Sequence, residues 1–202
     1  MTNRTELIKL LQEKTSRGGF RELDSSQQEM LIRRTIQGDR RLTDRVDLDI
    51  ISADCLVWAA SFGMIMLHEV NASDETEFSR HVHAAENYLD LLLLGEESPG
   101  KIMDGYLILD LTHSEIALRF LVPQTEQNTR LVRKHCVWHF GGNWQRVDRI
   151  SVLTLTDDTA YVETDLSPDL NEAGFSLIEA LEEMSGRKLA TLHASEWEEY
   201  HD

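Results

Sequence analysis

The sequence predicts an α+β protein in which helices come first and an antiparallel sheet follows. Two observations predict this class. Apolar residues recur every three or four positions up to about residue 95, as in amphipathic helices, and after residue 102 they alternate with polar residues, as in strands. The order of the elements is not the repeated strand–helix–strand pattern of a parallel sheet. We therefore expect about four N-terminal helices packed with an antiparallel meander of about five strands and one further helix.

The first two helices are predicted from their end signals. Asn3 can cap a helix that ends at the glycines of positions 18–19. Ser26-Gln27-Gln28-Glu29 has the spacing of a capping box, so it opens a second helix, which ends near Gly38. Each of these helices carries apolar residues on one face.

A third helix, buried on most of its surface, is predicted from about residue 46 to about residue 69. Its apolar run, residues 50–67, is near the lower length limit for a membrane span. Asp54 interrupts the run and no positively charged flank sets an orientation, so we favour a buried helix over a membrane helix.

The fourth helix is predicted to be capped by Ser73 and to end at Gly95. The segment 95–101 that follows has the spacing G-x-x-x-x-G-K, but Ile102 stands where a phosphate-binding loop needs Ser or Thr. We therefore interpret this segment as a linker. The core stripe of the helix is predicted to consist of Phe78, Val82, Ala85, Leu89 and Leu92.

The second half of the chain is predicted to form the sheet. Gly141-Gly142-Asn143 predicts a tight hairpin between two strands, with Trp138 and Trp144 near the turn. A helix over 168–184 and a short strand over 189–193 follow. The predicted strands of the meander are 106–111, 116–122, 131–140, 144–156 and 160–165.

The chain is expected to divide into a helical region (1–95), a region of sheet and helix (102–194) that shares its core with the first, and an acidic tail (195–202). Trp197 and Tyr200 of this tail lie three residues apart, so one helical turn would place both on one side. They either dock on the body of the protein or form a recognition segment.

The charge of the chain excludes several classes of function. The 36 acidic and 20 basic residues give a net charge of −16, which disfavours direct binding to nucleic acid and to anionic membranes. A reducing, cytoplasmic location is expected, because Cys55 and Cys136 cannot make a disulfide framework and no signal peptide is visible. The sequence lacks the common catalytic motifs, and we expect neither a cofactor nor a metal.

Four residues are candidates for a pocket between the helices and the sheet. Asp54 is the one charge in an apolar run, where it either pairs with an arginine or serves as a functional carboxylate. Arg133, His135 and His139 would share one face of a strand. The two histidines would lie about 13 Å apart, too far to share a metal ion.

Arginines cluster in residues 33–45 of this acidic chain. They either neutralise the protein's own carboxylates or bind an acidic surface of a partner. The candidate partner-binding residues are Arg33, Arg34, Arg40, Arg41, Trp197 and Tyr200.

The composition favours a non-catalytic, acidic protein-interaction module: a complex subunit, an adaptor, or an immunity or inhibitor protein that binds a basic protein. One alternative is a small-ligand-binding protein or an enzyme with a pocket between helices and sheet. The other is an inhibitor whose acidic surface mimics DNA. Oligomers are compatible with each of these.

Overall fold

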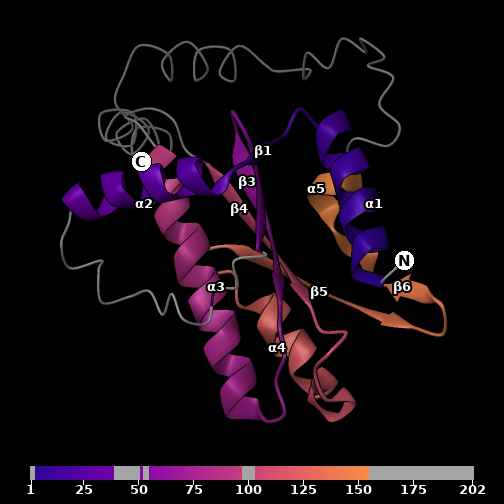
Figure 1. Cartoon of the computed structure of the whole chain (residues 1–202). Coiled ribbons are helices and arrows are strands. Elements are labelled where there is room, and N and C mark those ends of the chain that lie inside the picture. Colours follow the sequence, from indigo (N-terminus) through magenta and orange to yellow (C-terminus); the bar gives the residue numbers. More distant parts are fainter. Residues whose placement is uncertain (1–2, 39–50, 52–54, 97–102, 155–202) are drawn as a thin grey trace, which may run out of the picture. The chain divides into compact units, whose positions relative to one another are not determined.

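The computed structural model describes residues 3–38, 51, 55–96 and 103–154. The chain divides into two units, 1–159 and 160–202, and all the described residues belong to the first. The predicted elements over 160–165, 168–184 and 189–193 therefore lie outside the described residues. The elements (Figure 1) are α1 (Asn3–Arg17), β1 (Arg21–Leu23), α2 (Ser25–Gly38), β2 (Leu56–Ala60), β3 (Gly63–Glu69), α3 (Glu75–Glu96), β4 (Asp104–Asp110), the 3₁₀ helix η2 (Ile116–Leu121), α4 (Val122–Gln127), β5 (Arg133–Phe140), β6 (Asn143–Gln145), the 3₁₀ helix η3 (Val147–Arg149) and α5 (Ser151–Thr154).

The sheet is mixed, which corrects the prediction of an antiparallel meander packed with N-terminal helices. Its six strands follow the chain order from β1 to β6. The central strands β3, β4 and β5 are parallel, whereas β1, β2 and β6 pair antiparallel with their neighbours. Parallel neighbours need crossover connections, and here α3 joins β3 to β4, while η2 and α4 join β4 to β5. The coarser prediction of an α+β protein is confirmed.

Helices cover both faces of the sheet (Figure 1). On one face, Leu7 and Leu11 of α1 and Leu153 of α5 pack with Ile65 of β3 and Ile108 of β4. On the other face, α2, α3, η2 and α4 contribute to a second core, which includes buried residues from β3, β4 and β5. The sheet thus has one core on each side, and its central strands are buried on both faces.

The predicted helix over residues 46–69 is wrong, because β2 and β3 occupy much of this segment. Six of the seven residues of β3 are buried, so the strand shows no alternation of apolar and polar residues. Periodicity alone cannot distinguish such a strand from a buried helix. Gly63 begins β3 next to Asp104, and a side chain there would meet the Asp104 carbonyl oxygen at 2.7 Å.

Two predicted strands are also corrected. Residues 116–122 form η2 and the start of α4, in which Leu118, Leu121 and Val122 are buried at helical spacing. Of the described residues in the predicted strand 144–156, only those of β6 are extended. Arg146 has a left-handed φ of 68°, which ends β6 before η3 and α5.

The helix ends and the hairpin agree closely with the sequence. The residues of the predicted stripe of α3 are all buried. The caps differ from the predicted ones by one or two residues: Asp24, two residues before Ser26, caps α2 through the Gln27 backbone N–H, and Asp74, one residue after Ser73, caps α3 through the Glu77 backbone N–H. The hairpin between β5 and β6 turns at Gly141 and Gly142, whose φ angles are 62° and 84°.

Among the described residues, the longest apolar runs do not form a helix able to cross a bilayer. The run at 50–67, which raised that alternative, contains β2 and most of β3 instead.

Candidate functional site

Polar side chains gather where the three parallel strands end. Glu69 and Asp110 are the last residues of β3 and β4 and pair in register, and Asp110 pairs with Val137 of β5. The carboxyl ends of parallel strands are the usual place for ligand sites in open α/β sheets. This edge of the sheet is therefore a candidate ligand site.

Asp110 is the most unusual residue at this edge. It is 1% exposed, at the end of a strand that is otherwise apolar after its first residues. Its Oδ1 accepts hydrogen bonds from the Thr112 backbone N–H at 3.0 Å and from the Thr112 hydroxyl at 2.5 Å. The Thr112 Oγ1 in turn accepts a hydrogen bond from the His139 backbone N–H at 3.1 Å. The carboxylate is thus held in place by the residues that follow β4.

The start of α1 closes the same edge. Arg4 forms an ion pair with Glu69, and the Nδ2 of Asn3 lies 3.0 Å from the Nδ1 of His139, to which it donates. His113 approaches the other side of Glu69, with 3.8 Å between its Nε2 and the carboxylate Oε1. The Glu69 carboxylate therefore lies between a guanidinium and an imidazole.

Trp144 of β6 completes the wall. Its ring meets the His139 ring edge to face, with centroids 5.5 Å apart. Its indole Nε1 is buried and has no hydrogen-bond partner in the described structure. Tryptophan N–H groups usually find a partner when buried, so an acceptor atom of a ligand would satisfy this donor. Together these groups surround a cavity of about 290 Å³, the edge pocket, which is lined by Asn3, Arg4, Asp110, Thr112, His113 and Trp144.

A histidine pair lies on the opposite face of β3, under α3. His68 is fully buried, and its Nε2 lies 3.3 Å from the Nδ1 of His81. Burial, together with smaller contributions from the neighbouring His81 and Arg4, lowers the pKa of His68 to about 4. His68 is therefore neutral at pH 7. Its Nδ1 has no hydrogen-bond partner among the described residues, and His68 lines neither the edge pocket nor the pocket between α3 and α4.

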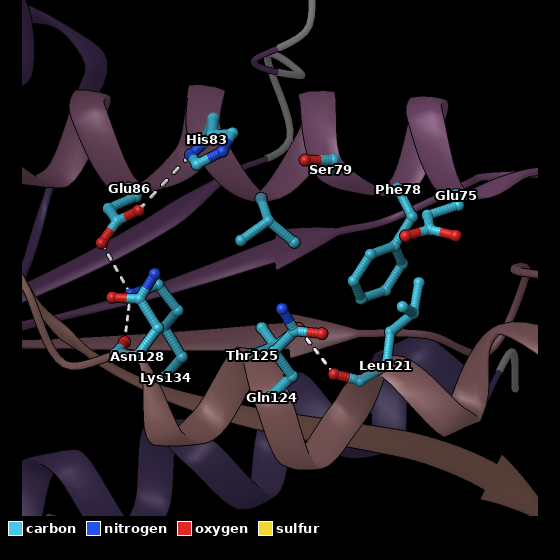
Figure 2. A pocket seen from close by; sticks show the side chains of 11 residues that line it. Glu75, Phe78, Ser79, His83, Glu86, Leu121, Gln124, Thr125, Asn128 and Lys134 are labelled. Atoms are coloured by element: carbon cyan, nitrogen blue, oxygen red, sulfur yellow. Dashed lines mark hydrogen bonds and ion pairs between the residues drawn. The ribbon is translucent and has the colours of Figure 1, made fainter.

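A second pocket lies between α3 and α4 (Figure 2). It has a volume of about 160 Å³, with Phe78, Val82 and Leu121 among its apolar lining residues. The Lys134 Nζ closes one end with a 2.6 Å ion pair to Glu86 Oε1, and both side chains are buried. The same ammonium also donates to the backbone carbonyl oxygens of Asn128 and Val132, at 2.6 and 3.3 Å. All three donors of this lysine are used, which is the arrangement of a structural ion pair.

An exposed aromatic surface lies at the carboxyl end of β5, which carries Trp138 and Phe140. The Arg119 guanidinium lies 4.7 Å from the centre of the Trp138 ring and 5.9 Å from that of Phe140. Ile116, Phe120 and Phe140 are 64%, 66% and 61% exposed. We call this set the Arg119 surface: Ile116, Arg119, Phe120, Trp138 and Phe140.

The structure places three of the four predicted pocket residues on β5. Arg133 is exposed and lies over the Tyr106 ring at 5.6 Å. Burial lowers the pKa of His135, whose buried Nε2 has no hydrogen-bond partner in the part of the chain that the structure describes. His139 contacts Asn3 and Trp144 at the rim of the edge pocket. Asp54, the fourth, lies outside the described residues.

The predicted partner-binding residues are only partly described. Arg33 and Arg34 are exposed on α2, and the Nη2 of Arg33 lies 3.5 Å from Glu29 Oε2. Arg40, Arg41, Trp197 and Tyr200 lie outside the described residues, as do the tail and most of the predicted linker at 97–101.

Sequence reasoning missed the edge pocket. The signal available was Asp110 at the end of the apolar run 106–109, but the companions of this carboxylate come from α1 and from the segment after β4. For metals, the described residues contain no group of three or more His, Cys, Asp or Glu side chains that could hold an ion. Comparison with protein-family models, with curated proteins and with solved structures found no match.

Proposed function

We propose that the protein is a protein-interaction module that binds its partner through the Arg119 surface. The observation that carries this proposal is the exposure of three large apolar side chains: Ile116 and Phe120, which share η2 with Arg119, and Phe140, whose ring lies 5.9 Å from the Arg119 guanidinium. Monomeric proteins rarely expose contiguous apolar patches without a function. Tryptophan, arginine and other aromatic residues also dominate the binding energy of protein interfaces.

The charges at this surface favour a partner segment that combines an apolar side chain with a carboxylate. Arg119 contacts two rings, and none of the carboxylates in the described ranges pairs with it. Arg146, whose guanidinium lies 5.6 Å from the centre of the Trp138 ring, is paired with Glu126. An incoming carboxylate would therefore find Arg119 held by its rings and available for an ion pair.

The prediction of a basic partner rests on the net charge of −16 of the whole chain. The charged group of the Arg119 surface is a guanidinium, which is positive. A basic protein would have to bind elsewhere on the acidic surface. The structure favours the acidic, apolar partner segment at this place, and the adaptor or inhibitor roles remain narrower versions of the same proposal.

The proposal is tested with the full chain immobilised and exposed to native extract of the source organism. The test variant is Phe120→Ser with Phe140→Ser, and the control is Met30→Ser, which alters a 62% exposed side chain on α2. Circular dichroism checks that all variants are folded. We expect a defined set of proteins to be retained by the wild type and the control and lost by the test variant. An identical captured set for all three would contradict the proposal.

A further inference from the structure

We infer that the edge pocket binds a small molecule carrying a positively charged nitrogen, and that Asp110 is the group that recognises it. This inference is independent of the Arg119 surface. It begins from an imbalance of charge: Asp110 is 1% exposed, and no cationic side chain in the described ranges forms an ion pair with it. A buried carboxylate needs a compensating charge, because its desolvation is expensive.

The arginine that lines the same cavity has another carboxylate as its ion-pair partner. The guanidinium of this residue, Arg4, is paired with Glu69. The hydrogen bonds that reach Asp110 come from Thr112, whose hydroxyl and backbone N–H are uncharged. Among the described residues Asp110 therefore has hydrogen bonds but no ion-pair partner, and a cationic ligand in the cavity would supply one.

The remaining wall of the pocket suits such a ligand. The Trp144 ring can contact a cation through its π-face, or its buried Nε1–H can donate to a ligand oxygen. The cavity of about 290 Å³ exceeds the roughly 30 Å³ of one water molecule several-fold. We therefore expect a small amine that also carries a hydrogen-bond acceptor, which the indole N–H would meet.

The position of the pocket fits this role. It lies at the carboxyl ends of β3 and β4, where the register brings Glu69 beside Asp110. The start of α1 covers it through Arg4 and Asn3. Binding of an amine would thus bridge α1, β4 and β6, and it should stabilise the folded state in proportion to the ligand concentration relative to its dissociation constant.

The experiment measures the melting temperature and intrinsic tryptophan fluorescence of the full chain with a panel of small amines: ethanolamine, serinol, glycinamide and putrescine. Ethylene glycol and glycerol, which lack the charged nitrogen, are the neutral probes. We expect at least one amine to give a saturable shift and the neutral probes to give none. If none of the amines binds saturably, or if neutral probes bind equally well, the inference is wrong.

Asp110→Asn keeps the shape of the side chain and removes its charge, so it should weaken amine binding at least tenfold. Asp104→Asn is the matched control, because Asp104 lies on the same strand and is exposed at its other end. Equal affinity in Asp110→Asn and the wild type would overturn the inference. Should Asp110→Asn fail to fold, Trp144→Leu takes its place, because it removes both the aromatic face and the indole N–H: a loss of affinity supports the site, and unchanged affinity overturns it.

Discussion

At the scale of single residues, the buried ion pair between Lys134 and Glu86 allows a direct test of what holds the fold together. Lys134→Met removes the cation 2.6 Å from the buried Glu86 carboxylate and leaves it only the more distant contact with the exposed His83 ring, at 3.7 Å, among the described ion pairs. We expect the free energy of unfolding to fall by about 3–5 kcal/mol, because an unpaired buried charge is strongly destabilising. Urea unfolding followed by circular dichroism measures this change.

The control is Arg33→Met, which removes an exposed ion pair with Glu29 and should change stability by less than about 0.5 kcal/mol. The double variant Lys134→Met with Glu86→Leu should recover most of the loss, since an apolar pair can replace a buried ion pair. A single variant as stable as the wild type would show that Glu86 reaches water.

His68 makes a second prediction, in which the sign follows from its pKa. The pKa is about 4 in the folded protein and near 6.5 in the unfolded chain. Between these values the unfolded chain binds the extra proton, so stability falls as the pH drops below 6.5. The expected loss from this residue is about 2 kcal/mol between pH 7 and pH 5.

The measurement compares urea unfolding at these two pH values for the wild type and for His68→Leu. The variant should lose the part of the pH dependence that belongs to His68. The pKa values of His81 and His135 are also lowered, so both contribute a residual slope of the same sign. If the pH dependence is the same in the variant, His68 is accessible to protons in the folded state.

Some properties of individual residues can be predicted from the sequence and others cannot. The burial of a cysteine at position 136 and the shared face of His135 and His139 follow from strand alternation alone. The role proposed for Asp110 does not follow from strand alternation. It depends on the ion pair of Arg4 with Glu69, and these two residues lie far from Asp110 in the sequence. Local pattern carries no information about such a charge balance.

At the scale of elements, the hairpin between β5 and β6 allows a direct test of turn chemistry. Gly142 has a φ of 84°, and a side chain there would meet nothing within 4 Å. Gly142→Ala should therefore destabilise through backbone conformation alone, by about 1–2 kcal/mol. Gly142→Asn is the matched control and should be milder, because asparagine adopts positive φ more readily.

Thermal unfolding of both variants measures the difference. If alanine proves as stable as glycine, the turn must adopt another conformation in solution.

The elements divide into those that local signals define and those that tertiary burial defines. Helices α1, α2 and α3 follow from capping residues, glycines and apolar spacing, all of which act within a few positions. Strands β2 and β3 do not, because they are buried on both faces and therefore resemble a buried helix in sequence. The parallel pairing of β3, β4 and β5 follows from the crossover segments. The sequence of one of these segments, η2 with the start of α4, predicts a strand, so the crossover between β4 and β5 could not be predicted.

At the scale of the whole molecule, the net charge of −16 is uneven along the chain. Residues 130–156 hold five basic and one acidic residue, whereas residues 157–202 hold two basic and 13 acidic residues. In the described part, most basic residues of 130–149 contact rings, carbonyls or carboxylates, as Arg133, Lys134 and Arg146 do. These cations therefore make contacts within the protein, and the excess of carboxylates sets the net charge that solvent ions and other molecules meet.

That excess predicts how stability responds to salt. Repulsion among like charges destabilises the compact state, and salt screens it because the Debye length falls from about 30 Å at 0.01 M to about 8 Å at 0.15 M. The buried pair of Lys134 and Glu86 is screened far less, so its contribution should persist. We expect the melting temperature to rise between 0.01 M and 0.15 M sodium chloride, and to rise equally with potassium chloride, since the effect is one of ionic strength. A fall in melting temperature over this range would mean that attractive surface pairs, such as that of Arg4 with Glu69, outweigh the repulsion of the acidic excess.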